Sequence, residues 1–263
     1  MSGADLQLIE AAAREAGELA LDYRRQGKVK VWGKPGGSPV TNADLAVDKL
    51  LTEKLRAARP DYGWLSEETA DDKSRLKARR VFVVDPIDGT LAYMKDRPHW
   101  AVSIAVVEDG QPTCGVLHAA AHGETFVAEA GQGARMNGQP IRVTDRAELE
   151  GAALLADLRY LRRPDWREPW PENLRIETRN SVAYRMALVA CGSFDAVVAM
   201  SSKCDWDLAA ADLIAREAGA LATDHRGRRF AYNRTSVRKP SLVCAGPQMH
   251  ALILRRVGHI ELA

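Results

Sequence analysis

Residues 81–90 have the sequence Val81-Phe82-Val83-Val84-Asp85-Pro86-Ile87-Asp88-Gly89-Thr90. A continuous apolar run bounded by turn residues is typical of a buried strand, so we expect Asp85 at the end of a strand. Pro86 keeps the residue before it extended. Asp88-Gly89-Thr90 is expected to turn into a helix start, where free N–H groups can hold an anion. The stretch therefore predicts a site for a hard cation and a phosphate; the alternative is a simple turn followed by Asp88 as a helix cap.

Length and composition favour a globular enzyme-sized chain. Its 263 residues allow one large or two fused α/β domains, and 46% hydrophobic residues are enough for a sizeable core. A net charge of +2 is too balanced to indicate nucleic acid as a partner. Early acidic residues speak against a signal peptide, and no apolar run reaches the roughly 20 residues of a membrane helix. The four cysteines form no CxxC pair, which fits reduced thiols in the cytoplasm.

The segment before residue 81 is predicted to hold two helices and a short strand. Apolar residues at three- and four-residue steps predict a helix over 4–26. The Gly/Pro-rich stretch 33–39 is expected to be a mobile loop, either a connector or a lid over the acidic site. A second helix is expected to open within 39–44, where Asp44 is most simply a first-turn acid favoured by the helix dipole. The basic run 73–80 is expected to be a solvated face.

Other acids lie at the edges of predicted elements. Glu67 follows a short apolar piece at 62–65, where solvated acids are common. Asp207 falls in the first turn of a predicted helix whose small alanine face indicates tight packing. Its simplest role is again that of a dipole-favoured acid.

The rest of the chain predicts a mixed α/β fold. We expect strands at 100–107, 113–118, 125–129, 151–158, 194–200 and 242–245, and helices at 181–191 and from residue 247. Residues 159–175 are expected to be irregular. A change of pattern near 144–150 suggests two halves, 1–147 with most of the acids and 148–263 with Asp207.

The separated acids can be explained together by metal ions. Carboxylates clustered without basic partners repel one another and shift their pKa values, and divalent cations relieve that repulsion. Ligands that are all oxygen, without His or Cys, favour Mg²⁺ over zinc. Two such ions on a phosphate would activate water, neutralise charge and stabilise the leaving oxygen.

Four motifs carry a resemblance to a known family. Glu67-Glu68, the 85–90 stretch, Trp206-Asp207 with its alanines, and Pro39-Val40-Thr41-Asn42-Ala43-Asp44 resemble the signatures of the inositol monophosphatase superfamily, in order and over nearly the whole chain. The resemblance implies a layered α/β/α/β/α sandwich. It also implies a Mg²⁺-dependent, often lithium-sensitive phosphomonoesterase acting on small phosphorylated substrates, commonly as a homodimer.

The resemblance also implies the metal ligands. Glu67, Asp85 and the Ile87 carbonyl would hold one Mg²⁺. Asp85, Asp88 and Asp207 would hold a second, with Asp85 bridging the two. A weaker third ion would lean on Glu67 through water.

The same resemblance assigns the remaining catalytic groups. Asp44 and Thr90 would orient or deprotonate the attacking water, with Glu67 also catalytic through its metal. The backbone N–H groups of Gly89 and Thr90 would hold the phosphate. Asp207 would also lie beside the substrate.

The substrate is predicted from what surrounds these motifs. Inositol phosphatases carry a Glu shortly before the Trp-Asp motif, but residues 197–203 contain no acid. Arg185 lies where related 3′(2′),5′-bisphosphate nucleotidases carry a basic residue, although their Tyr-Pro-Arg-like piece is missing; Lys203 is either its substitute or a solvated lysine. The leading hypothesis is hydrolysis of 3′-phosphoadenosine 5′-phosphate to AMP and phosphate. The alternatives are an inositol-1-phosphate or broad sugar monophosphatase, and, in another class, an RNA-polymerase-associated binding factor.

Overall fold

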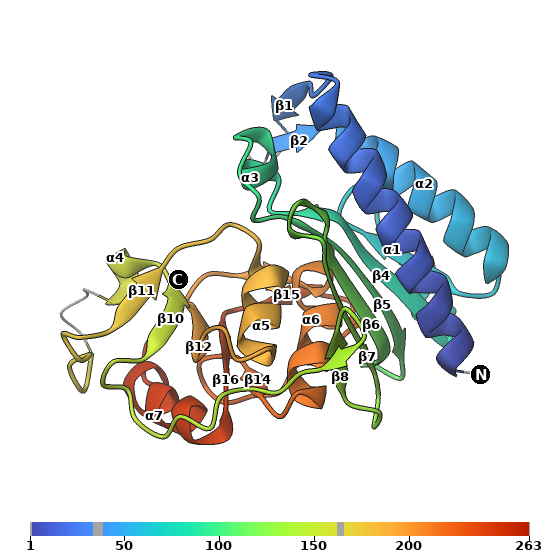
Figure 1. The fold of residues 1–263 in the computed structure, drawn as a ribbon. Helices are drawn as coiled ribbons and strands as arrows, with labels where there is room; N and C mark the ends of the chain where they lie inside the picture. The colour runs from blue at the N-terminus through green and yellow to red at the C-terminus, as the bar shows by residue number, and fades with distance from the viewer. Residues whose placement is uncertain (1, 34–38, 162–165, 263) are drawn as a thin grey trace.

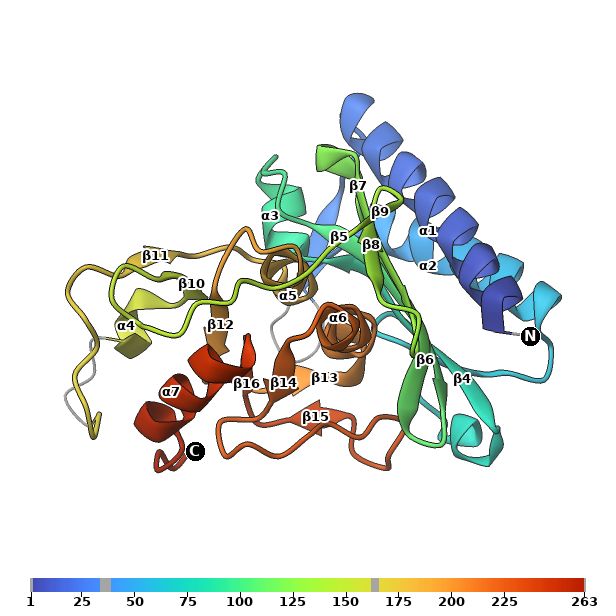
Figure 2. The ribbon, with the colours of Figure 1, turned by 60° about the horizontal axis from the view of Figure 1, so that its bottom comes forward.

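Helices and sheets alternate in five layers (Figure 1). In this computed structural model, which describes residues 2–33, 39–161 and 166–262, helices α1 (Ser2–Arg25) and α2 (Asn42–Ala58) cover one face of a first sheet. Helices α5 (Val182–Ala190) and α6 (Asp205–Glu217) lie between the first and second sheets, and α7 (Pro247–Val257) covers the far face of the second (Figure 2). The predicted α/β/α/β/α sandwich is confirmed.

The first sheet has seven strands in the order β3-β4-β5-β6-β7-β8-β9. Only β3 and β4 run parallel, and the other neighbours are antiparallel. Their bounds are β3 Gly63–Ser66, β4 Arg80–Asp88, β5 Ala101–Glu108, β6 Gln111–Ala119, β7 Glu124–Glu129, β8 Ala134–Met136 and β9 Gln139–Pro140.

The second sheet has five strands in the order β11-β10-β12-β16-β14. Strand β10 lies parallel to both β11 and β12, whereas β16 is antiparallel to β12 and β14. Their bounds are β10 Ala153–Ala156, β11 Arg175–Glu177, β12 Ala196–Ala199, β14 Leu221–Thr223 and β16 Leu242–Ala245.

The smaller elements connect these layers. Strands β1 (Val31–Gly33) and β2 (Pro39–Thr41) form an antiparallel pair, as do β13 (Lys203–Cys204) and β15 (Arg238–Lys239). Short helices are α3 Thr90–Met94, α4 Leu158–Leu161 and the 3₁₀ turns Ser74–Lys77 and Ala120–His122.

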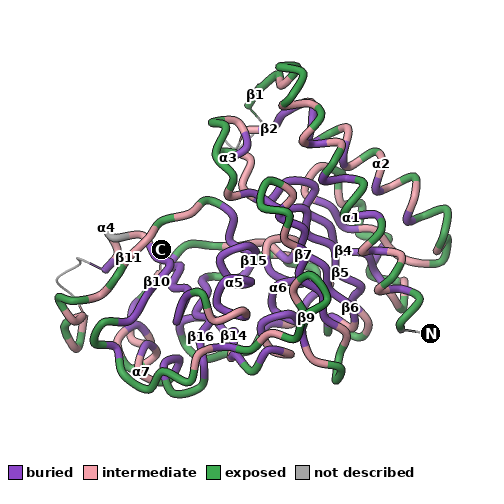
Figure 3. The backbone as a smooth tube through the Cα atoms, in the orientation of Figure 1, coloured by how far each residue is buried: buried purple, intermediate pink, exposed green. Residues whose placement is uncertain are grey.

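Strand β4 shows why this sequence builds layers. Its side chains alternate between two cores, because successive residues of a strand face opposite sides of the sheet. Phe82 and Val84 pack with α1 and α2, whereas Val81 and Val83 pack toward α5 and α6. The buried backbone of Figure 3 follows both sheets and the helices between them. The fully apolar run of the sequence is therefore a strand covered on both faces.

Three sequence predictions need correction. The strand at residues 81–85 extends to Asp88 instead of ending at Asp85, with an irregularity between Asp85 and Asp88. The basic run 73–80 is not wholly solvated, because the Arg75 side chain is 0% exposed. The segment 159–175 is not irregular throughout, since α4 reaches residue 161 and Arg175 begins β11, an edge strand of the second sheet.

Two further predictions, the mobile loop and the division into halves, are not tested by the described residues. Residues 34–38 of the predicted loop lie outside the described residues, and its ends at 33 and 39 belong to β1 and β2. The division into halves at 147/148 stays a prediction. Among the described residues, no helix combines the length and the apolar character needed to cross a membrane.

Candidate active site

Three carboxylates from separate elements of the fold converge at one place. Glu67, Asp85 and Asp207 each offer one oxygen, and these oxygens lie within 4.8 Å of one another. Glu67 follows β3, Asp85 belongs to β4, and Asp207 lies in the first turn of α6. Acids that are 140 residues apart at their farthest in the sequence are thus brought to one place by the fold.

Strand register places Glu67 beside Asp85. In the parallel pair β3 and β4, Ser66 is the register partner of Val84, and the Glu67 N–H donates to the Val84 carbonyl at 3.2 Å. The next residue of each strand is therefore the acid. Asp85 Oδ1 accepts a bond from the Ile87 N–H at 3.1 Å, which bends the chain around the carboxylate.

Helix α6 brings Asp207 to the sheet. Asp207 Oδ2 accepts from the Cys204 N–H at 2.7 Å, as the acid of a capping box does at a helix start. The helix lies close to β6, because a Cβ added to Gly115 would come within 2.9 Å of the Ala210 carbonyl oxygen. The tight packing predicted from the alanine face is confirmed.

Asp88 is tied to the start of α5. Its Oδ2 accepts from the Ser181 hydroxyl at 2.5 Å and from the Ala183 N–H at 2.7 Å. Asp88 is not part of the three-oxygen group, although its charge acts on Asp85 and Asp207. The sequence did not single out Ser181, whose only signal was its place before the apolar helix 182–190.

Asp44 and Thr90 form a hydrogen-bonded pair. The Thr90 hydroxyl lies 3.2 Å from Asp44 Oδ1 and 3.1 Å from the Ile87 carbonyl oxygen, and can donate to either. Asp44 Oδ2 accepts from the Thr41 N–H at 2.8 Å and from the Thr41 hydroxyl at 2.5 Å. The first-turn role expected for Asp44 is confirmed by its capping box with Thr41, and the bond to Thr90 adds a link to the acidic site.

Gly89 forms the turn between β4 and α3. It has a φ of 97°, in the region that L side chains rarely adopt. A Cβ there would also lie 2.8 Å from the His99 carbonyl oxygen and 3.1 Å from Ser181 Cβ. Glycine is thus required twice, and the predicted turn into a helix at Thr90 is confirmed.

The acids raise one another's pKa values. Burial raises the pKa of Asp207 to about 7, with repulsion from Asp88 and Glu67 contributing. Burial also raises the pKa of Asp88 to about 6, with repulsion from Glu67 contributing. The pKa of Asp85 is also well above its usual range, through burial and the charges of the neighbouring acids. Burial likewise raises the pKa of Asp44. This is the electrostatic state expected of a site that a cation would stabilise.

Two cationic side chains lie beside the acids. Arg185, on α5, is 9% exposed, and its buried Nε has no hydrogen-bond partner among the described residues. Asp88, Asp207 and Asp157 are the acids whose charges act on it. The Lys203 ammonium donates hydrogen bonds to Ser201 and Ser202. Burial lowers the pKa of Lys203, and repulsion from Arg185 lowers it further.

A profile described as the inositol monophosphatase family matches residues 5–261. The chain belongs to this family. Its members are metal-dependent phosphatases, and this chain is a phosphatase of that kind. The resemblance stated from the four sequence motifs is confirmed.

Relatives of the family match almost the entire chain. A histidinol-phosphatase of Chlorobaculum parvum is 33% identical and covers 98% of both chains. A Nus factor SuhB of Xylella fastidiosa is 34% identical, over 84% of this chain and 82% of its own. The structure of an IMPase from Thermotoga maritima superposes with a TM-score of 0.82 at 29% identity, covering 97% of this chain and 96% of its own.

The donor atoms fit the metal ions that the family requires. Glu67, Asp85 and Asp207 supply only carboxylate oxygens. Hard divalent cations prefer such oxygen ligands. The raised pKa values of Asp85 and Asp207 give an independent reason for a cation here.

Proposed function

We propose that this phosphatase uses two to three Mg²⁺ ions to hydrolyse a small phosphate monoester. The convergence of Glu67, Asp85 and Asp207 carries the proposal. Glu67, Asp85 and the Ile87 carbonyl would hold one ion, and Asp85 would bridge to a second held with Asp88 and Asp207. A weaker third ion would lean on Glu67 through water. When bound, the ions would acidify the attacking water and neutralise the phosphate charge.

Asp44 and Thr90 would act on the attacking water. Thr41 holds one oxygen of Asp44 through two bonds, which leaves the other oxygen facing the Thr90 hydroxyl. Thr90 can then donate its proton to Asp44 and accept one from water, so that Asp44 serves as the base. A raised pKa for Asp44 supports this role, because a base works best when its pKa approaches the working pH.

The phosphate would lie at the turn formed by Gly89. The absence of a side chain at Gly89 keeps this turn open, and the N–H groups of Gly89 and Thr90 would donate to the phosphate oxygens. Asp207 would flank the substrate through the second ion.

For the substrate we propose a 3′(2′),5′-bisphosphate nucleotide, with 3′-phosphoadenosine 5′-phosphate converted to AMP and phosphate. Support comes from Arg185 and Lys203, which lie close enough together for the charge of Arg185 to contribute to lowering the pKa of Lys203. A second phosphate would relieve that repulsion and offer an acceptor to the Nε of Arg185.

A monophosphate is the second candidate, and the names of relatives favour it. Histidinol-phosphatase is the name of a relative matched over 98% of both chains, and inositol-1-monophosphatase that of a Rhizobium meliloti relative at 32% identity. The names of SuhB relatives likewise support a binding function as an alternative of another class. An Asp88→Asn chain separates that function, because it should lose phosphatase activity while a binding role would persist.

A substrate panel tests the choice. The kcat/KM values for 3′-phosphoadenosine 5′-phosphate, histidinol phosphate, inositol 1-phosphate and fructose 1,6-bisphosphate would be compared in Mg²⁺, with and without Li⁺. The nucleotide is expected to be preferred, and Lys203→Met is expected to raise KM for it and leave KM for inositol 1-phosphate unchanged. A clear preference for either monophosphate would overturn the nucleotide proposal. Li⁺ is expected to inhibit.

We also propose a cytoplasmic homodimer. The dimer rests on the family resemblance, and the cytoplasmic location on four cysteines that are free in the structure. Sedimentation equilibrium would give about twice the 28.8 kDa chain mass, and a single chain mass would contradict the dimer.

A further inference from the structure

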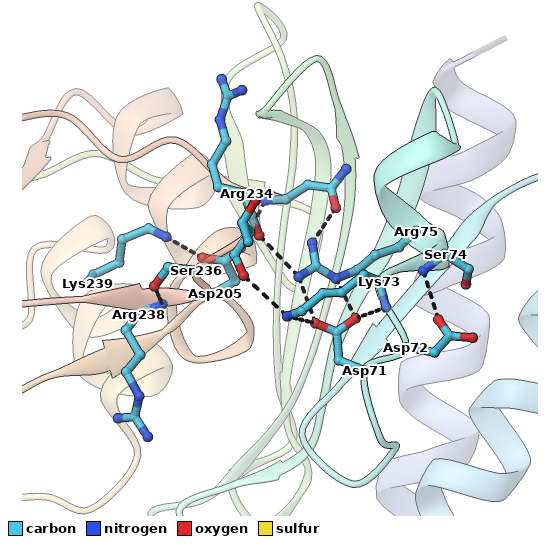
Figure 4. A network of polar contacts seen from close by, with 12 residues as sticks. Asp71, Asp72, Lys73, Ser74, Arg75, Asp205, Arg234, Ser236, Arg238 and Lys239 are labelled. Carbon is cyan, nitrogen blue, oxygen red and sulfur yellow. Dashed lines mark hydrogen bonds and ion pairs between the residues drawn. The ribbon is translucent and has the colours of Figure 1, made fainter.

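A partly buried chain of polar contacts joins the two segments that carry Glu67 and Asp207. Figure 4 shows it running from Asp71 and Arg75 on one side to Asp205 and Lys239 on the other. The segment 232–239, here called the strap, contributes Asn233 and Lys239 to these contacts. We propose that this chain of contacts is a positioning device that sets the spacing of the metal ligands, with Asn233 as its central residue; the inference rests on the proposed metal-dependent function.

The first half of the device is built on Arg75. Its guanidinium holds Asp71 through Nε at 3.0 Å and Nη2 at 2.8 Å, a two-pronged geometry that fixes both side chains. Asp71 lies four residues after Glu67. Arg75 is fully buried and therefore cannot adjust its position freely. The segment after Glu67 is thus anchored to a rigid cation.

The second half is built on Asp205, which is 0% exposed. Asp205 forms an ion pair with Lys239 and accepts from the Asn233 N–H at 2.9 Å through Oδ2. It is the first residue of α6 and lies two residues before Asp207. Strand β13, which directly precedes α6, also pairs with β15, so the strap contacts the start of α6 through this pairing as well as through Asp205.

Asn233 connects the halves. Its backbone N–H binds Asp205, and its side-chain Oδ1 accepts from Arg75 Nη1 at 2.6 Å. The Arg75 Nη2 also donates to the Arg234 carbonyl at 3.1 Å, and the Lys73 ammonium to the Thr235 carbonyl at 3.2 Å. Asn233 therefore contacts both the Glu67 side and the Asp207 side of the site, and the Arg234 and Thr235 carbonyls add contacts from the strap to the Glu67 side.

Such a link matters because the metal ligands belong to different layers. Glu67 is fixed by the first sheet and Asp207 by a helix, and the oxygens of both must stay within a few ångströms of Asp85, which is proposed to bridge their two ions. Supporting contacts around a metal site orient its ligands and typically change affinity by roughly 10- to 100-fold when lost. The device is farther from the ions than a direct supporting contact, so we expect an effect at the lower end.

Asn233→Gly is the sharpest test. Asn233 has a φ of 52°, which glycine adopts without strain, so the substitution removes the side-chain link and keeps the backbone. Asn233→Asp would restore an acceptor for Arg75. Asn137→Gly is a matched control, because Asn137 also has a positive φ of 48° and bonds Thr125 and Gly123 in a turn outside the device.

Mn²⁺ binding to chelator-treated full-length protein, followed by electron paramagnetic resonance, would be measured for each variant. Asn233→Gly is expected to weaken Mn²⁺ binding about 10-fold, Asn233→Asp to bind nearly as the parent chain does, and Asn137→Gly to bind as the parent chain does. The melting temperature without metal is expected to fall by a similar amount in both glycine variants, which separates an effect on ligand position from an effect on general stability.

Two outcomes would overturn the inference. One is unchanged Mn²⁺ affinity in Asn233→Gly, and the other is an equal loss in Asn137→Gly. The proposed function fails in a different way: the parent chain would then bind no Mn²⁺, or Asp85→Asn would bind it as tightly as the parent chain, and the inference would fall with it.

Discussion

Asp88 and Ser181 are joined by a hydrogen bond of 2.5 Å across the boundary between the first sheet and the central helices. The same Asp88 oxygen accepts from the Ala183 N–H, so the last residue of β4 caps α5 from outside the helix. Asp88 is thereby placed beside Arg185 and the other acids. The bond lowers the pKa of Asp88 against the larger effect of burial.

Ser181→Ala should loosen this junction. The helix loses its N-cap bond to the Tyr184 N–H, which typically costs about 1 kcal/mol of unfolding free energy. The pKa of Asp88 rises further, so protons compete better with metal ions and the acid limb of the kcat/KM profile moves to higher pH. Urea unfolding and a pH–rate profile measure the two effects. Ser193→Ala, at an exposed serine, is the control and should change neither the free energy of unfolding nor the acid limb. If the acid limb of Ser181→Ala stayed at the parent pH, the role assigned to the Ser181–Asp88 bond would be contradicted.

Asp88→Asn keeps the shape of the side chain and removes its charge. One acceptor oxygen remains for Ser181 or Ala183, so the fold should persist, while a proposed metal ligand is lost. We expect kcat/KM to fall by more than about 100-fold, since even supporting contacts are worth 10- to 100-fold. Both kcat/KM and the circular dichroism spectrum of the variant would be measured. An Asp88→Asn chain with a native spectrum and parent-like kcat/KM would show that Asp88 is not a metal ligand.

Without metal, the acids of the site should make stability fall as pH rises. The pKa of folded Asp207 is about 7 and that of Asp88 about 6, above the usual range near 3.8. Between these values the folded chain binds more protons than the unfolded chain, so this contribution to the free energy of unfolding decreases as the pH increases from about 4 to 7.

The Asp207→Asn variant isolates that effect. Asparagine can still accept from the Cys204 N–H, and one charge of the cluster is gone. Metal-free Asp207→Asn is expected to melt higher than the parent chain at pH 8 and to lose this advantage at pH 5. Mg²⁺ should raise the melting temperature of the parent chain more at pH 8 than at pH 5. A parent chain stabilised equally by Mg²⁺ at both values would show that the raised pKa values do not govern metal binding.

Gly89→Ala should damage both stability and catalysis. The new Cβ would meet the His99 carbonyl oxygen at 2.8 Å, in addition to the strain of a φ of 97°. Gly123→Ala is a suitable control, because its φ is 66° and nothing lies within 4 Å of its Cβ. Gly123→Ala is expected to cost about 1 kcal/mol through strain alone, and Gly89→Ala more than about 2 kcal/mol. Equal losses in thermal unfolding would show that the turn can relax away from His99.

The acids of the site were predictable because each follows a local signal. Asp85 ends an apolar run, and Asp207 lies in the first turn of an alanine-rich helix. The local pattern of hydrophobic residues determines whether a segment forms a helix or a strand, and the parallel register of β3 and β4 then brings Glu67 beside Asp85. The layer order follows from the same alternation, since β4 is apolar on both faces and must be covered twice.

Arg75 and Ser181 were not predictable in the same way. Arg75 belongs to a basic run, and such runs are usually solvated; its acceptors on the strap are Asn233 and the Arg234 carbonyl, at separations of 158 and 159 residues. Ser181 has the sequence of an ordinary N-cap, and its bond to Asp88 spans 93 residues. No local pattern encodes such pairings, because they depend on how separate layers pack.

The most direct measurement is phosphate release by chelator-treated protein as Mg²⁺ is added back, with the parent chain and Asp85→Asn compared on the best substrate of the panel. Asp85 is proposed to bridge two ions, so the parent chain should be inactive without metal and recover with Mg²⁺, while Asp85→Asn should stay inactive at every Mg²⁺ concentration and keep the native fold. Full activity in the metal-free parent chain, or parent-like recovery in Asp85→Asn, would contradict the proposed metal-dependent mechanism.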